Sequence, residues 1–220
     1  MRLIAVVTCH SYEYPKQDSG AAHHSRIDTV RSSAIRRTWH NDWLRHKDEI
    51  DLKFFYGRGE RSPEADEVFL DVPDDYYSLP IKVKAVFQWA LDHHYDFCLK
   101  VDDDVFVWVD RLIRNYPSDD YRGFMLEASE GKYASGTAYW LSRKAMEVVV
   151  KAEWNPADFA EDKYVGRTLA YNGINLAHDD GFQCCNCPGC MSRYSEENRI
   201  SLHTTSPEEM VALHKANNRV

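Results

Sequence analysis

Short apolar runs of strand length alternate along this chain with longer segments in which apolar residues recur every third or fourth position. This alternation predicts an α/β fold, in which helices flank a central sheet. The expected strands lie at residues 1–10, 51–57, 67–72, 96–101 and 136–142. The expected helices lie at residues 27–39, 80–93, 143–153, 160–173 and 206–218.

Three of these helices have recognisable ends. Ser142 directly precedes a helical segment as a typical N-cap, and Gly173 closes another as a typical C-cap. The last helix has Ser206 at the N-cap, Pro207 at the first helical position and Glu209 at the third. This combination is a capping box with proline in its favoured place, and it predicts a well-defined helix start.

Length and charge narrow the class of protein. The 220 residues are enough for a sizeable core, and we expect a single domain over residues 1–220. The formal net charge of −8 argues against a general nucleic-acid binder, which would carry a basic face. No run reaches the roughly 18 apolar residues of a membrane span, and the apolar start is too short for a secretory signal. We therefore expect a cytoplasmic protein or, as the alternative, a fragment of a longer anchored protein of the Golgi lumen.

Three consecutive aspartates, Asp102 to Asp104, follow the apolar run at 96–101. Functional groups of an α/β sheet gather at the carboxyl ends of its strands, and these carboxylates stand at such an end. Three interpretations are open: a solvated turn, a phosphatase that forms an aspartyl phosphate, or a site that holds a divalent cation for a diphosphate. The phosphatase pattern fails, because the fifth position counted from Asp102 is Phe106.

Six separated stretches resemble those of the β-1,3-galactosyltransferase family (glycosyltransferase family 31), which includes β-1,3-N-acetylglucosaminyltransferases and the Fringe enzymes. In the family's order they are "RSSAIRRTW", "DDYYSLPIKVKAVFQW", "LKVDDDVFV", "YASGTAYWLSRKA", "EDKYVG" and "ISLHTTSPEEM", and they cover roughly residues 28–211. The sequence departs from the family at Ser78-Leu79-Pro80, where the family has Asn-Leu-Thr, and at Ala138, where it has glycine. These departures concern the sugar specificity more than the reaction.

The resemblance implies a GT-A (Rossmann-like) nucleotide-sugar glycosyltransferase fold with a central mixed sheet. It implies an inverting, Mn²⁺-dependent hexosyltransferase that moves a sugar from a UDP-sugar donor to a hydroxyl of a glycan acceptor, in a β-1,3 linkage. Galactose is the first choice of sugar and N-acetylglucosamine the second. The alternative is a catalytically inactive protein of the same fold that binds a sugar nucleotide or a carbohydrate.

The resemblance also implies roles for acidic and histidine residues within the motifs. Asp104 and His203 correspond to the family's Mn²⁺ ligands, and Asp102 and Asp103 would contact the ribose or metal-bound water. A carboxylate and an imidazole, completed by diphosphate oxygens and water, suit Mn²⁺ better than Mg²⁺. Asp162 corresponds to the base that takes the proton of the acceptor hydroxyl, although the helix dipole alone also favours an aspartate at a helix start.

Four basic residues are candidate partners for the donor phosphates or the uracil: Arg31, Arg36, Lys82 and Lys100. Arg36 is preferred over Lys82, because a lysine beside an apolar helix stripe is usually solvated. Ser135 and Gly136 match a segment that lies under the donor sugar, where a small residue permits close backbone approach.

The six cysteines fall into two groups. Cys9 and Cys98 lie in strand-like runs and are expected in the core, as is Trp39. The others form the cluster "CCNCPGC", made by Cys184, Cys185, Cys187 and Cys190. A disulfide in an oxidising compartment, and reduced thiols or zinc in the cytoplasm, both stay open. Because the cluster lies between Asp162 and His203 in the sequence, we expect a loop that borders the acceptor cleft.

Overall fold

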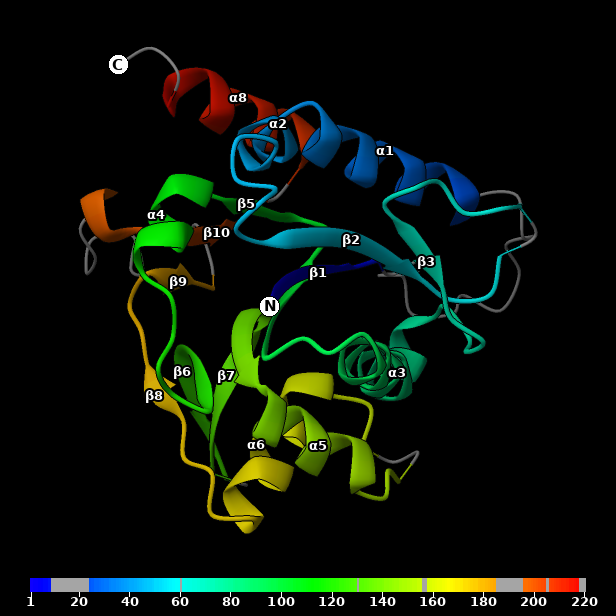
Figure 1. The fold of residues 1–220 in the computed structure, drawn as a ribbon, viewed down its shortest axis with the longest axis vertical. Helices are drawn as coiled ribbons and strands as arrows, with labels where there is room; N and C mark the ends of the chain where they lie inside the picture. Colours follow the sequence, from blue (N-terminus) through cyan, green and yellow to red (C-terminus); the bar gives the residue numbers. More distant parts are fainter. Residues whose placement is uncertain are drawn as a thin grey trace.

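A computed structural model describes residues 1–8, 24–59, 61–129, 131–155, 158–184, 196–204 and 206–217, with side chains in the first helix described from residue 30 onward. Seven strands form the main sheet, in the order β3-β2-β1-β4-β7-β6-β8 (Figure 1). Their bounds are β1 Arg2–Val7, β2 Asp51–Tyr56, β3 Glu67–Phe69, β4 Phe97–Asp102, β6 Tyr121–Ala128, β7 Gly131–Ser142 and β8 Ala177–His178. Strands β3, β2, β1 and β4 are mutually parallel, whereas β7 runs antiparallel to both β4 and β6. The expected mixed sheet is therefore confirmed.

A second, three-stranded sheet continues from the end of β4, and we call it the small sheet. It has the order β5-β10-β9, with β5 Val105–Val107, β10 Ser201–His203 and β9 Phe182–Gln183. β10 runs antiparallel to β5 and parallel to β9. The small sheet thus joins a strand from the middle of the chain to one that comes about a hundred residues later.

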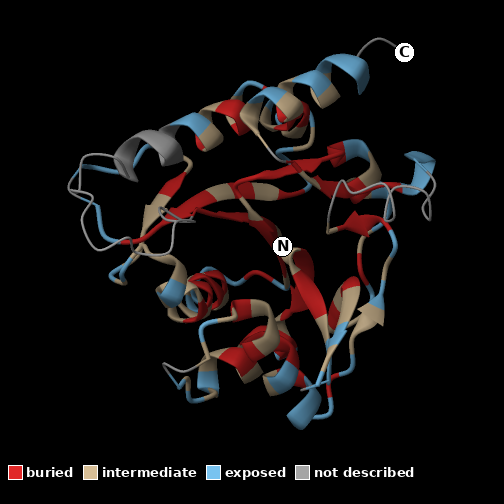
Figure 2. Cartoon of the chain, turned by 180° about the vertical axis from the view of Figure 1, so that it is seen from behind, coloured by how far each residue is buried: buried red, intermediate tan, exposed pale blue. Residues whose placement is uncertain are grey.

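Helices cover both faces of the main sheet. Alternate residues of each strand point to opposite faces, so the strands contribute to two cores. Ile4 and Val6 face a core formed with α1 His24–Arg36, α2 Trp39–Trp43, α4 Val109–Arg114 and α8 Pro207–Asn217. Leu3 and Ala5 face the other core, formed with α3 Leu79–Asp92, α5 Arg143–Lys151 and α6 Glu161–Tyr171. Two short 3-10 helices, η1 Tyr76–Ser78 and η2 Glu196–Asn198, complete the described elements. Figure 2 shows the buried central strands between partly exposed helices. No helix in the described ranges is both long and apolar enough to cross a membrane.

The first helix differs from its expected bounds of 27–39. It ends at Arg36, and a separate short helix begins at Trp39. The break falls at Thr38, whose hydroxyl donates back to the carbonyl of Ala34 over 2.7 Å. Such back-bonding by threonine competes with the helical ladder. Trp39 is fully buried as expected, and its indole N–H donates to the carbonyl of Val105 over 3.0 Å.

The expected helix caps are present. The Ser142 hydroxyl accepts from the backbone N–H of Ala145 over 3.2 Å, and Gly173 has φ +75°, the left-handed conformation typical of a C-cap. The Ser206 hydroxyl accepts from the backbone N–H of Glu209, also over 3.2 Å. The start of α8 is therefore fixed next to His203 at the end of β10.

Replacing Ser206 by alanine is expected to lower the free energy of unfolding by about 1 kcal/mol, because the Glu209 N–H loses its acceptor. Ser206→Asp should restore stability, since aspartate caps a helix as well as serine does. Urea unfolding of the three proteins measures this. Equal stability of the wild type and Ser206→Ala would show that the cap contributes nothing.

Candidate active site

The aspartate triplet is not a solvated turn. Asp103 is 1% exposed and Asp104 7% exposed, so the interpretation as a solvated acidic turn is wrong. Burying carboxylates this close together requires a compensating cation or donor. Arg31 of α1 supplies part of it, with its Nη1 atom 3.2 Å from Asp103 Oδ1 and 3.5 Å from Asp104 Oδ2.

The structure brings His203 to Asp104. His203 Nε2 lies 3.3 Å from Asp104 Oδ2, although the two residues are far apart in sequence. The pairing of β10 with β5 places them, because His203 is in register with Val105, the residue that follows Asp104. Thr204 holds the turn, since its backbone N–H and its hydroxyl both donate to the Asp104 carbonyl, over 2.8 and 2.7 Å.

Each member of this pair favours the charged form of the other. The hydrogen bond with Asp104 raises the pKa of His203, against the opposing effect of burial. Burial would raise the pKa of Asp104, but the hydrogen bond from His203 and the charges of His203 and Arg31 outweigh it and lower the pKa. The pair therefore places a carboxylate and an imidazole side by side at the end of β4.

The surroundings of Asp104 fit a divalent cation that takes part of its ligands from a substrate. Asp104 Oδ1 is buried and has no hydrogen-bond partner among the described residues. A cavity of about 10 Å³ beside it has room for a single water-sized group. Within the described ranges, no three His, Cys, Asp or Glu side chains are grouped to hold a metal. The assignment of Asp104 and His203 as the protein ligands, with diphosphate oxygens and water completing the coordination, stays a prediction.

Lys100 of β4 links the triplet to the strand and helix beside it. Its side chain is 1% exposed, and its Nζ atom lies 2.5 Å from Asp102 Oδ1 and 3.3 Å from Glu161 Oε2. It also donates to the carbonyl of Gly136 in β7. Burial alone would lower the pKa of Lys100, but the carboxylates of Asp102 and Glu161 outweigh burial and raise it. Lys100 is thus a buried cation that connects β4, β7 and α6.

Asp162, the expected base, lies at the start of α6 on the other side of this lysine. Its Oδ2 atom accepts from the backbone N–H of Gly136 over 3.1 Å, and its Oδ1 atom accepts from the N–H of Lys163 over 2.8 Å. Each carboxylate oxygen has a second lone pair for a further donor. Gly136 therefore contacts Lys100 through its carbonyl and Asp162 through its N–H.

Gly136 has little room for a side chain. A Cβ at this position would lie 3.3 Å from Glu161 Oε2 and 3.4 Å from the Asp162 carboxylate. The neighbouring Ser135 is 4% exposed, and its hydroxyl lies 3.1 Å from that of Thr137. The predicted donor-sugar segment is therefore packed directly against the start of α6.

The interpretation of Lys82 as a solvated lysine is wrong, because its side chain is completely buried. Its Nζ atom donates to the Thr8 carbonyl over 2.5 Å and to the Thr8 hydroxyl over 3.1 Å, and it pairs with Asp74. Thr8 follows Val7, which is in register with Asp102. Lys82 therefore ties the segment before α3 to the strand end beside the aspartates, and its contact with a donor stays a prediction.

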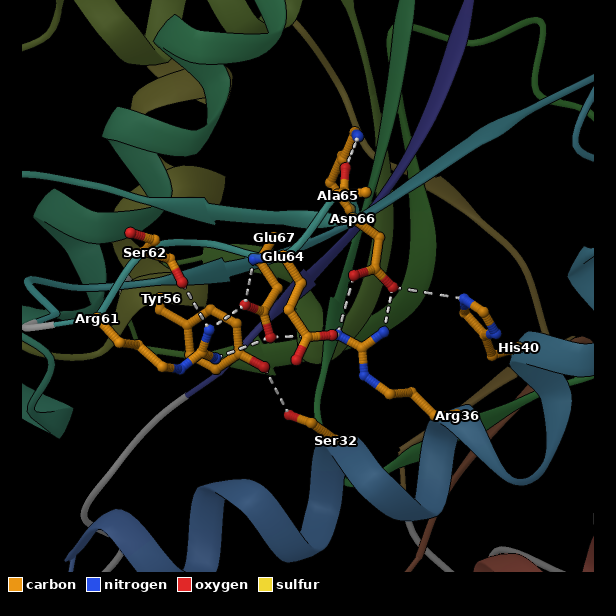
Figure 3. A network of polar contacts seen from close by, with 11 residues as sticks. Ser32, Arg36, His40, Tyr56, Arg61, Ser62, Glu64, Ala65, Asp66 and Glu67 are labelled. Carbon is orange, nitrogen blue, oxygen red and sulfur yellow. Dashed lines mark hydrogen bonds and ion pairs between the residues drawn. The ribbon is translucent and has the colours of Figure 1, made fainter.

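The structure does not bring Arg36 to the aspartate triplet. Its guanidinium pairs with Asp66 and lies 3.2 Å from Glu67 Oε1, as Figure 3 shows. It also lies over the ring of Phe54, 4.3 Å from the centroid. Arg61 joins the same network through two hydrogen bonds to Glu67, of 2.6 and 2.9 Å. These contacts explain Arg36 as a link between α1 and β3, and its predicted contact with the donor gains no support from them.

Sequence reasoning missed Glu161, the first residue of the "EDKYVG" stretch. Glu161 is 6% exposed and receives a hydrogen bond from the Tyr139 hydroxyl as well as the contact from Lys100. Burial raises the pKa of Glu161, and the charge of Lys100 opposes this. No local pattern pointed to it, because its partner Lys100 lies on β4, 61 residues earlier in the chain.

Two of the six cysteines, Cys98 and Cys184, lie within the described residues. Cys98 is fully buried, as expected, and burial raises the pKa of its thiol. Cys184 is half-buried just after β9. Cys9, Cys185, Cys187 and Cys190 lie outside the described residues, so the predictions for them stay predictions.

Two solved structures define the structural class. A glycosyltransferase involved in glycosylation of the major capsid of PBCV-1 matches with a TM-score of 0.54 and 14% identity, over 96% of this chain and 98% of that one. An active-site variant of the galactosyltransferase LgtC matches with a TM-score of 0.51 and 12% identity, over 98% and 96%. At these identities the likeness concerns the fold, and it identifies the mixed sheet with its flanking helices as a GT-A glycosyltransferase fold.

The sequence comparisons support the family resemblance over part of the chain. The family model described as Galactosyltransferase matches residues 30–125, a range that contains the aspartate triplet. The human lactosylceramide 1,3-N-acetyl-beta-D-glucosaminyltransferase is 29% identical over 102 residues. That match covers 38% of this chain and 27% of the relative's length. The resemblance to the β-1,3-galactosyltransferase family is thereby confirmed.

Proposed function

We propose that this protein is an inverting, cation-dependent glycosyltransferase that moves a hexose from a UDP-sugar to a hydroxyl of a glycan acceptor. The observation that carries the proposal is the 3.3 Å approach of His203 to Asp104 at the end of β4, in a GT-A fold. Asp104 offers a carboxylate and His203 an imidazole, and Asp104 Oδ1 is buried without a partner among the described residues. Such a mixed pair of ligands suits a cation that is shared with a diphosphate.

Four residues at the end of β4 and on the neighbouring elements would act on the UDP leaving group: Asp102, Asp104, His203 and Arg31. Asp104 and His203 would hold Mn²⁺, which as a Lewis acid neutralises the charge of the departing diphosphate. Arg31 holds the carboxylates of Asp103 and Asp104 in place through its contacts of 3.2 and 3.5 Å, and its charge helps to lower the pKa of Asp104. Asp102, fixed by Lys100, faces the same strand end and is available to a ribose hydroxyl.

Asp162 acts on the acceptor. The acceptor oxygen forms a bond to the anomeric carbon while the bond from that carbon to the diphosphate oxygen breaks, and its electron pair leaves with UDP. The hydroxyl proton passes to Asp162. Gly136 N–H and Lys163 N–H hold the carboxylate in position for this transfer, over 3.1 and 2.8 Å. With one base and no protein nucleophile, the displacement inverts the anomeric configuration.

The sugar and linkage follow the family. Galactose is the first choice because residues 30–125 match the Galactosyltransferase model. N-acetylglucosamine is the second, supported by the printed name of the human relative, and a β-1,3 linkage is proposed on the same ground.

Cation-dependent binding of UDP tests the site. Titration calorimetry with Mn²⁺ present should detect UDP binding to the wild type, and Asp104→Asn and His203→Ala should each weaken it at least about tenfold. His46→Ala is the matched control, because His46 also pairs with an aspartate, 2.6 Å from the exposed Asp110, and has no recorded contact with the triplet. UDP binding of equal strength with and without Mn²⁺, or in all four proteins, would refute the cation site.

A further inference from the structure

Two aromatic rings meet at the surface close to Asp162, and the reaction as described leaves them without a role. Tyr77 is 42% exposed and Phe159 is 45% exposed. Their ring centroids lie 5.9 Å apart in an edge-to-face arrangement. Tyr76 extends the group, with its ring centroid 6.1 Å from that of Tyr77. Adjoining exposed rings from distant parts of a chain are unusual in a protein surface that binds nothing.

Phe159 is held near the candidate base. It precedes Asp162 by three residues, so at most about 10 Å of extended chain separates them. Two contacts hold Asp158: the Trp154 indole donates to its carbonyl over 2.9 Å, and Arg167 of α6 pairs with its carboxylate over 2.5 Å. Phe159 therefore follows a residue that is anchored to α6.

Tyr77 is tied to the other side of the site. It lies in η1, whose start is capped by Asp75 through two hydrogen bonds of 2.9 Å to Ser78. The preceding Asp74 pairs with buried Lys82, which reaches Thr8 at the end of β1. Thr8 is one residue beyond Val7, the register partner of Asp102.

Two chains of contacts connect the aromatic pair to the strand end that carries the aspartates. One runs from Asp102 through Lys100 and Glu161 to the start of α6 and Phe159. The other runs from the same strand end through Thr8 and Lys82 to Tyr77. α3 and α6 contact each other on the same face of the sheet, as Figure 1 shows. The contact between the rings of Tyr77 and Phe159 connects the segments that precede these two helices.

The chemistry of the two rings indicates which kind of ligand they would bind. An aromatic face carries partial negative charge and binds the partly positive C–H face of a pyranose, while Tyr77 adds a hydroxyl for hydrogen bonding. Among the described residues, the ring contacts of the pair include no lysine or arginine, so the pair supplies no cation for a phosphate. The acceptor must reach Asp162, and Phe159, three residues before it, brings the Tyr77 ring to that helix start.

We propose that Tyr77 and Phe159 form the platform on which a neutral pyranose of the acceptor stacks while its hydroxyl reaches Asp162. This inference rests on the proposed glycosyltransferase function and names the acceptor as a sugar with an exposed apolar face. It assigns specificity for the acceptor to two residues that have no role in the proposed reaction. Tyr77 lies in the "DDYYSLPIK" stretch, and Phe159 lies before the "EDKYVG" stretch.

Binding of small glycosides tests the platform without requiring turnover. Saturation-transfer NMR with methyl β-galactoside, methyl β-glucoside and methyl N-acetyl-β-glucosaminide, in the presence of UDP and Mn²⁺, should detect at least one bound sugar. Tyr77→Ala and Phe159→Ala should each weaken that binding by about tenfold. Tyr77→Phe and Phe159→Tyr should largely restore it. Tyr171→Ala is the matched control, since Tyr171 is 91% exposed at the far end of α6.

The outcomes separate this inference from the function it rests on. Loss of sugar binding with unchanged Mn²⁺-dependent UDP binding supports the platform. Unchanged sugar binding in both alanine variants, or no binding of any of the three glycosides to wild type that binds UDP, overturns it. Weakened UDP binding with intact sugar binding also overturns it, because the rings would then serve the nucleotide. Absence of UDP binding in every protein contradicts the proposed function instead.

Discussion

Asp162→Asn is expected to lower the rate of sugar transfer by about 10²–10⁴-fold, because asparagine cannot take the proton of the acceptor hydroxyl. The substitution keeps the size of the side chain and one of the two backbone hydrogen bonds that hold it, from Gly136 or Lys163. Initial rates of UDP release and of glycoside formation measure the effect, with a UDP-galactose or UDP-N-acetylglucosamine donor.

Two comparisons make this result specific. Asp92→Asn is the matched control, because Asp92 is an exposed carboxylate at the end of α3 that accepts only from Gln88 among its recorded contacts, over 2.8 Å. Mn²⁺-dependent UDP binding should be the same in both variants. Transfer by Asp162→Asn at the rate of the wild type would rule out Asp162 as the base.

Lys100→Met is expected to destabilise the protein by about 3–5 kcal/mol, because it leaves the buried carboxylates of Asp102 and Glu161 without their cation. Methionine fills a similar volume, so the loss reports charge more than packing. Lys144→Met is the matched control: Lys144 pairs with Asp120 over 2.6 Å but is 70% exposed, and its loss should cost less than about 1 kcal/mol. Urea unfolding measures both.

The destabilised variant should recover stability at low pH. Burial, opposed by Lys100, already raises the pKa of Asp102 to about 7, above its value of about 3.8 in the unfolded chain. A group with a raised pKa in the folded state binds protons on folding, so it favours the folded form increasingly as pH falls from 7 towards 4. Loss of Lys100 strengthens this trend. Glu161→Gln in the Lys100→Met background should also recover stability, and equal stability of the single and double variants at neutral pH would contradict the account.

Much of the fold was predictable from local patterns. The strands β1, β2 and β4 and the helices α3, α5, α6 and α8 were found within a few residues, because each is a long apolar run or stripe with a marked end. Strand β6 was not predicted. Its segment, Tyr121–Ala128, mixes polar and apolar residues and contains Gly123, where a Cβ would lie 2.9 Å from that of Ala134. Its position depends on a neighbour that no local pattern reveals.

The short strands of the small sheet show a second limit. β5, β9 and β10 have two or three residues each, too few for a period to be recognised. The proximity of Asp104 and His203 depends on these strands, so composition and periodicity give no access to it. The family resemblance named both residues, whereas only the register of β10 with β5 explains why they meet.

Buried charge was the hardest feature to predict. Lys82 and Lys100 were predicted as partners for a ligand, with a solvated residue as the alternative for Lys82, and their burial was not foreseen. Both are internal cations bound by carboxylates and carbonyls. A lysine is almost never fully buried unless it is paired, and its partners here come from segments up to 74 residues away.

The distance in sequence between the two members of the pair has a consequence for biosynthesis. Asp104 lies in the turn between β4 and β5, while His203 is on β10, about a hundred residues later. During translation the chain emerges from its amino end, so the seven strands of the main sheet leave the ribosome before the imidazole does. A nascent chain could therefore form most of its core before His203 is available. Binding of the proposed cation would then wait until β10 pairs with β5.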